Sequence, residues 1–193
     1  MHRLSASFVL GYHGCDAAVA ELLLQNLPFS PSHNTWDWLG GGIYFWEANP
    51  LRGLEFASEV AARNGNGITT PAVIGAVLDL GFCLDLTTSL GLQKVKDAYL
   101  EMSRVTEEAG MALPRNLPDG RHNLDCAVLN YLHRVREASD IPFDTVKGIL
   151  TEDPLLYPGS AFGSKNHVQI AVRNPACIKG VFRVAEVDLD PRA

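Results

Sequence analysis

Long apolar segments are missing from this sequence of 193 residues. No stretch approaches the roughly 20 apolar residues that are needed to cross a bilayer. Residues 1–8 include His2 and Arg3, but they contain no apolar core of the length found in secretory signal peptides. These absences predict a cytoplasmic protein that has no contact with a membrane.

Cysteine and basic charge are also scarce. The four cysteines are far apart and form no Cys-x-x-Cys pair of the kind that zinc sites use, so we expect reduced thiols and no metal. Lysine and arginine number 16 against 22 acidic residues, which gives a formal net charge of −6. This balance argues against nucleic-acid binding through overall charge, although a local basic patch stays open.

Several common catalytic signatures are absent as well. The sequence contains no Gly-x-x-x-x-Gly-Lys-Ser/Thr loop, no His-Glu-x-x-His pair and no Gly-x-Ser-x-Gly elbow. Gly40-Gly41-Gly42 is rich in glycine, but it follows no expected strand of a βαβ unit and opens no helix. The sequence therefore does not predict a dinucleotide-binding fold of the Rossmann type.

What remains is the composition of an ordinary folded domain, with 47% hydrophobic and 20% charged residues and no linker or repeat. We expect a single domain over residues 1–193. Hydrophobic periodicity and turn residues predict a mixed α+β order. The expected strands are 8–12 (ending at His13-Gly14), 43–46, 73–78, 82–86, 145–150, 168–172 and 180–187, and the expected helices are 16–25, 49–63, 89–109 and 124–137.

Three short motifs place polar and aromatic residues at the ends of expected strands. They are Tyr12-His13-Gly14, then Gly42-Ile43-Tyr44-Phe45 with the following helix that contains Phe56, and finally Asn166-His167-Val168-Gln169-Ile170. In this order the set resembles the His–Tyr–Glu signature of PARP-like and diphtheria-toxin-like ADP-ribosyltransferases. The run from Leu39 to Phe45 looks like that of small bacterial members of the superfamily.

This resemblance implies a fold and a chemistry. The fold would be an ADP-ribosyltransferase-like split β core of two mostly antiparallel sheets with flanking helices, and NAD would lie between the sheets as a substrate, without a metal. ADP-ribose would pass to a macromolecular acceptor, which is a protein, RNA or DNA. Small bacterial relatives act as toxins or in phage defence, so an antitoxin or immunity protein is a conceivable partner.

The resemblance also assigns roles to individual residues. His13 would orient a ribose, the backbone of Gly14 would receive the nicotinamide carboxamide, and Tyr44 would stack on the nicotinamide ring. A glycine permits close approach to the backbone, and ring stacking contributes about 1 kcal/mol beyond burial. The expected NAD site consists of Tyr12, His13, Gly14, Gly42, Tyr44, Phe56 and Gln169, of which His13, Tyr44 and Gln169 would be catalytic.

Gln169 departs from the family pattern, which has glutamate there. An amide can hydrogen-bond a ribose hydroxyl, but it supplies no negative charge to an oxocarbenium ion and cannot act as a general base. Three interpretations stay open: the acceptor brings its own nucleophilicity, another carboxylate (Glu47, Glu152 or Asp153) substitutes, or NAD is bound without turnover.

The alternatives to ADP-ribosyl transfer are accordingly an NAD glycohydrolase and a binding module for NAD or ADP-ribose. RNA 2′-phosphotransferases share the implied fold, but they hold a phosphate with basic residues. No cluster of basic residues stands out in this sequence.

Overall fold

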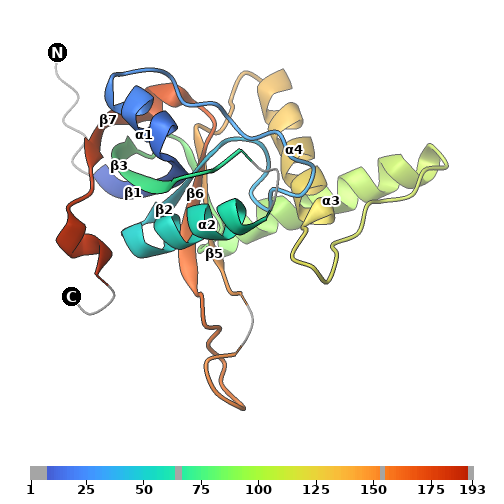
Figure 1. The fold of residues 1–193 in the computed structure, drawn as a ribbon. Helices are drawn as coiled ribbons and strands as arrows, with labels where there is room; N and C mark the ends of the chain where they lie inside the picture. Colours follow the sequence, from blue (N-terminus) through green and yellow to red (C-terminus); the bar gives the residue numbers. More distant parts are fainter. Residues whose placement is uncertain (1–7, 64–66, 153–154, 191–193) are drawn as a thin grey trace.

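The computed structural model describes residues 8–63, 67–152 and 155–190. Within them the chain forms seven strands, four α-helices and two short 3₁₀-helices (Figure 1). In chain order these are β1 (Phe8–Asp16), α1 (Ala17–Leu24), β2 (Ile43–Glu47), α2 (Pro50–Ala62), β3 (Pro71–Asp79), β4 (Cys83–Asp85), α3 (Ser89–Glu108), α4 (Asn123–Ala138), β5 (Thr145–Leu150), β6 (His167–Val172), η1 (Pro175–Cys177), β7 (Ile178–Arg183) and η2 (Glu186–Leu189).

The first three helices begin at polar caps that the sequence supplies. The side chain of Asp16 accepts a hydrogen bond from the backbone N–H of Ala18 at 2.9 Å, and that of Asn49 accepts one from Arg52 at 3.0 Å. Thr88 does the same for α3. Each cap satisfies an N–H group of the first turn that has no partner within the helix, which fixes where the helix starts.

The strands form one mixed sheet in the order β4-β5-β6-β2-β1-β3-β7. The pair β4–β5 is parallel and the other pairs are antiparallel. The ladder between β1 and β2 is short, running only over Gly11↔Glu47 and Tyr12↔Trp46, whereas β1 pairs with β3 along its whole length. The two halves of the sheet are therefore joined by little hydrogen bonding in the middle.

Each face of the sheet carries a core. On one face, buried side chains of β4, β5 and β6 pack with those of α4 and α3, among them Leu84, Val146 and Leu129. On the other face, Phe45 and Leu78 belong to a second cluster, and α1 covers a third. Figure 1 shows α2 across the middle of the sheet, with α3 and α4 to one side of α2.

The α+β class and the mostly antiparallel pairing are confirmed, but the expected division into two sheets is not, because the seven strands form one mixed sheet. Most expected boundaries are right within two residues. Two are wrong. The first strand continues through His13 and Gly14 to Asp16, because β3 pairs with it over that stretch. The last expected strand, 180–187, is in fact β7 at 178–183 followed by the 3₁₀-helix η2.

The segment between β5 and β6 was expected to be a long loop, and this is confirmed. It projects beyond the end of the sheet (Figure 1), and its described part folds back on itself through a bridge between Leu155 and Gly163. None of the helices in the described part of the chain is both long and apolar enough to cross a membrane.

Helix α2 lies so close to β1 that the contact leaves no room for a side chain. A Cβ atom added to Gly14 would lie 2.1 Å from the backbone carbonyl oxygen of Gly53 and 3.4 Å from the Cβ of Ala57. Because the nearest obstacle is backbone, it cannot move aside as a flexible side chain would. The structure thus gives Gly14 a packing role, whatever else it contacts.

We predict that Gly14→Ala lowers the free energy of unfolding by about 3 kcal/mol, the upper end for overpacking, because α2 must shift away from the sheet. The matched control is Gly180→Ala in β7, where an added Cβ meets no atom within 4 Å. This control should change stability by less than about 0.5 kcal/mol. Urea unfolding of both variants makes the comparison, and equal midpoints would contradict the packing role.

Candidate active site

A cleft of about 680 Å³ opens on the sheet face that carries α2. Its floor is formed by Tyr44 and Trp46 of β2 and by Gln169 of β6, and α2 supplies one wall. The loop between α1 and β2 and the segment that precedes α4 supply the other wall. The volume lies within the range of about 300–1,000 Å³ that is usual for small-molecule sites.

The topology brings the three sequence motifs to neighbouring strands, because β6, β2 and β1 are adjacent in the sheet. Trp46 pairs with Gln169 on one side and with Tyr12 on the other, so these three side chains share a face. Tyr44 lies two residues before Trp46 and points to the same face. Segments that are more than 120 residues apart in the sequence therefore meet at one place.

Tyr44 lines the cleft and holds the glycine run beside it. Its hydroxyl donates to the carbonyl of Gly40 at 2.8 Å and accepts from the backbone N–H of Leu39 at 3.0 Å. Burial raises the pKa of Tyr44 well above its ordinary value, with a smaller contribution from the charge of Asp37. The phenol is therefore neutral at physiological pH, as its double role of donor and acceptor requires.

Gln169 is buried, with 7% of its surface exposed, and its amide is oriented by a tryptophan. The indole Nε1 of Trp38 donates to Oε1 of Gln169. Trp38 can reach this position because it lies against Gly148 of β5, where an added Cβ would be 2.8 Å from the indole ring. The carbonyl end of the amide is thus occupied, which leaves its NH₂ group as the donor for a ligand.

Two further expected residues also line the cleft. Phe56 of α2 is partly exposed, and its ring lies 4.9 Å from that of Trp46 at an angle of 44°. Gly42 lies at the edge of β2 opposite the carbonyl of Val172, which an added Cβ would approach to 3.0 Å. The structure therefore brings together four of the seven expected residues, Gly42, Tyr44, Phe56 and Gln169.

Tyr12, His13 and Gly14 are not among the residues that line the cleft. Tyr12 is buried against Phe182 in an edge-on contact, and Gly14 lies beneath α2. His13 points to the opposite face of the sheet, where its ring packs against Phe29 and Phe45 at 5.3 and 5.6 Å.

His13 still contacts the second motif directly. Its Nδ1 donates to the backbone carbonyl of Tyr44 at 2.8 Å, at the point where the ladder between β1 and β2 has ended. Burial lowers the pKa of His13, so the ring is neutral and this hydrogen bond places its proton on Nδ1. The imidazole thus takes the place of the missing ladder bond.

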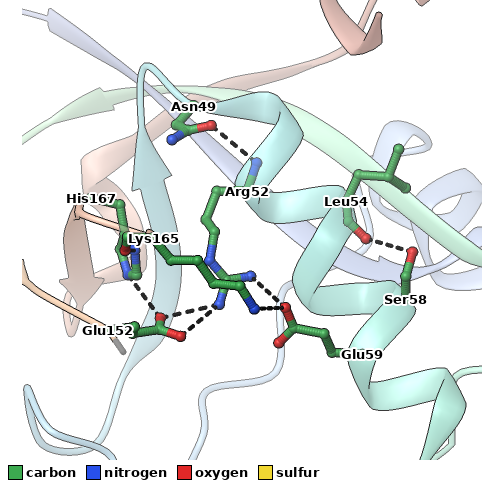
Figure 2. Close-up of polar contacts among 8 residues, drawn as sticks. All are labelled: Asn49, Arg52, Leu54, Ser58, Glu59, Glu152, Lys165 and His167. Carbon is green, nitrogen blue, oxygen red and sulfur yellow. Dashed lines mark hydrogen bonds and ion pairs between the residues drawn. The ribbon is translucent and has the colours of Figure 1, made fainter. Parts of the chain in front are cut away.

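A charged cluster beside the cleft was not expected from the sequence (Figure 2). Arg52 of α2 is only 5% exposed, yet its guanidinium contacts two carboxylates. One NH₂ group lies 3.1 and 3.2 Å from the two oxygens of Glu152, and the other is 3.4 Å from Glu59. Lys165 also binds Glu59, at 2.6 Å. The cluster ties α2 to both ends of the loop between β5 and β6.

His167 completes this cluster at the start of β6. Its Nδ1 donates to the carbonyl of Lys165 at 2.7 Å, and its Nε2 lies 3.6 Å from Glu152. Burial lowers the pKa of His167, opposed by its hydrogen bond to the backbone of Lys165. With the ring neutral, the cluster contains two cations and two carboxylates and has no net charge.

The three carboxylates that were considered as substitutes for glutamate at position 169 now differ. Glu47 does not line the cleft and pairs with Lys147 at 2.7 Å. Asp153 lies outside the described residues. Glu152 lines the cleft together with Gln169 and keeps 30% of its side chain exposed. Of the two that lie within the described residues, Glu152 is therefore the one that can face a bound ligand.

Comparison of the chain with protein-family models, with curated proteins and with solved structures returns no match. The described residues contain no group of three or more His, Cys, Asp or Glu side chains that could hold a metal ion. The site must therefore be interpreted from its own geometry: an aromatic and amide floor beside a partly buried ion cluster with no net charge.

We predict that Arg52→Met lowers the free energy of unfolding by about 2 kcal/mol, less than the roughly 3–5 kcal/mol of fully buried pairs, because the glutamates left behind can hydrate. The matched control is Arg104→Met on α3, whose i,i+4 pair with Glu108 is 61% and 63% exposed. This control should cost at most about 0.5 kcal/mol. Equal denaturation midpoints for the two variants would show that the cluster does not stabilise the fold.

Proposed function

We propose that the chain binds NAD in the cleft and transfers its ADP-ribose to a macromolecular acceptor. The observation that carries the proposal is the convergence of the second and third motifs. Tyr44 and Gln169 come from adjacent strands, point to the same face and line the same cleft. The resemblance in sequence implied this arrangement, and nothing in the spacing of the two residues along the chain required it.

The pairing of β1 and β2 gives further support. In the proposed split core, the strands that carry the first two motifs belong to different halves of the sheet. The two-pair ladder between β1 and β2 fits such a division of the sheet into β4-β5-β6-β2 and β1-β3-β7. His13 donates to the carbonyl of Tyr44 at this junction between the two halves of the sheet. In the proposal it is a positioning residue that acts through the second motif.

The chemistry requires the bond between nicotinamide and ribose to break. Its electron pair leaves with neutral nicotinamide, and positive charge develops on C1′ of the ribose. A nucleophile of the acceptor attacks C1′ and releases its proton to solvent. Tyr44, Trp46 and Phe56 offer aromatic surface to the bases of NAD. Gln169 donates its amide N–H to a ribose hydroxyl, and Glu152 supplies the negative charge that the amide lacks.

A second function, an NAD- or ADP-ribose-binding module, is favoured by one specific observation. The amide of Gln169 is neutral, and the carboxylate of Glu152 is already bound to Arg52. A site with no uncommitted negative charge would bind the ground state of NAD and stabilise its transition state little. Turnover distinguishes the two functions.

We predict that the wild type releases nicotinamide from labelled NAD, and that Gln169→Ala slows the release at least tenfold through loss of the hydrogen bond to the ribose. Gln169→Glu should release nicotinamide at the wild-type rate or faster. A carboxylate can accept the same hydrogen bond from Trp38 and adds a negative charge. Labelled protein or nucleic acid would indicate transfer, and free ADP-ribose would indicate hydrolysis. If calorimetry shows tight binding of NAD, and neither the wild type nor Gln169→Glu turns NAD over, the result would assign the binding function instead.

We predict that Glu152→Gln lowers kcat about 100-fold, the scale of one electrostatic group in a transition state, with little change in KM for NAD. The matched control is Glu47→Gln, which also breaks a partly exposed pair with a cation but lies outside the cleft. Its kcat should equal that of the wild type. Equal rates for the two variants would exclude Glu152 as the source of negative charge.

A further inference from the structure

A second pocket of about 400 Å³ lies next to the cleft, between α4 and the loop that precedes β2. Its lining includes His33, Gly41, Asn130, His133, Arg134 and Arg173. Residues 133 and 134 belong to α4, and residue 173 directly follows β6. The pocket is separate from the charged cluster around Arg52, which lies on the side of α2.

A single extended segment forms the wall between the two cavities. Ser32 and Asn34 line the cleft, whereas Pro31 and His33 line the second pocket, as alternation along an extended chain requires. Two hydrogen bonds between the backbones of Ser32 and Gly42, at 2.8 and 3.1 Å, hold this segment in place. Gly42 lines both cavities, so a ligand in one lies close to a ligand in the other.

The lining of the second pocket is cationic, although the chain as a whole carries a net charge of −6. Arg134 is exposed and forms no ion pair within the described residues; its guanidinium lies over the ring of Tyr131. Arg173 donates to the carbonyl of Gly41 at 2.9 Å and to Glu137 at 2.7 Å. No carboxylate is among the lining residues, so the pocket favours an anion.

A buried histidine gives an independent indication of a ligand. His133 is only 2% exposed, and neither of its ring nitrogens has a hydrogen-bond partner in the described part of the chain. Burial and the charge of Arg173 lower the pKa of His133 to about 3, so the ring is neutral. An unsatisfied buried polar group costs about 1–3 kcal/mol. A polar ligand group that reached one of these nitrogens from the pocket would offset this cost.

We propose that the second pocket binds a phosphate of a single-stranded nucleic acid, and that a base further along the same strand stacks on Trp36, which lines the cleft. Trp36 is 44% exposed and lines the cleft, on the far side of the wall from Arg134. A cationic groove combined with an exposed aromatic ring is the arrangement that proteins use for single strands. The claim that this strand is the acceptor of ADP-ribose rests on the proposed function. The claim that the strand binds to the second pocket does not rest on it.

The test is a titration of a short fluorescent single-stranded oligonucleotide, followed by anisotropy at several salt concentrations without NAD. Arg134→Ala should weaken binding about tenfold and reduce the slope of log K against log salt by about one, because one phosphate contact is lost. Trp36→Ala should weaken binding about tenfold through loss of stacking. Inorganic phosphate should compete with the oligonucleotide for the wild type.

Arg104→Ala is the matched control, since it removes the same charge from an exposed position on α3. It should leave the affinity and the salt slope as in the wild type. Equal affinities for Arg134→Ala and Arg104→Ala, or no binding of the oligonucleotide at low salt, would overturn the proposal. So would binding of a phosphoserine peptide by a protein that does not bind the oligonucleotide. Because NAD is absent, this result is independent of whether the chain turns NAD over.

Discussion

The contact between the backbones of Gly14 and Gly53 determines the geometry of the rest of the site. Glycine on both sides lets α2 lie directly against β1, closer than any side chain would allow. From this contact the helix runs over β2, where Arg52 and Phe56 meet the ring of Trp46. A larger residue at either glycine would move α2, which forms one wall of the cleft, and with it Arg52, the partner of Glu152.

The floor of the cleft depends on another glycine, Gly148 of β5. Gly148 leaves the space into which Trp38 fits, and Trp38 in turn orients the amide of Gln169. Tyr44 fixes the glycine run on the other side through its hydroxyl. A site built in this way is preorganised, because the groups that would contact a ligand are already held by the scaffold, and little reorganisation is needed on binding.

The parts of this arrangement that depend on local pattern could be predicted from the sequence. Asn49-Pro50 marks the start of α2, and alternation along β2 places Tyr44 and Trp46 on one face. Contacts over long separations could not be predicted in this way. Nothing near Arg52 in the sequence indicates that it would be buried, since its partner Glu152 lies 100 residues away. Arg134 and Arg173 likewise form a cluster only in three dimensions.

The errors of the prediction have similar causes. Residues 180–187 alternate well enough for a strand, but β3 offers partners only as far as Arg183, and the chain then turns into a 3₁₀-helix. His13 was expected beside Tyr44 on the ligand side. Period-two alternation in β1 places it with Phe45 instead, because Tyr12 pairs with Trp46 and adjacent residues point to opposite faces.

Charge balance limits how the cleft could hold a dinucleotide. Its lining contains the three arginines 52, 63 and 121 and the four carboxylates 37, 59, 119 and 152. Arg52 is committed to glutamates and Arg121 to Asp119, so a diphosphate would meet little uncompensated positive charge there. Affinity for NAD would then come chiefly from aromatic surface and from hydrogen bonds such as that of Gln169, with Arg63 as the exception at the rim. A further uncompensated positive charge, that of Arg134, lies on the other side of the segment of residues 31–34, where in the proposed arrangement it would hold the nucleic acid and not the dinucleotide.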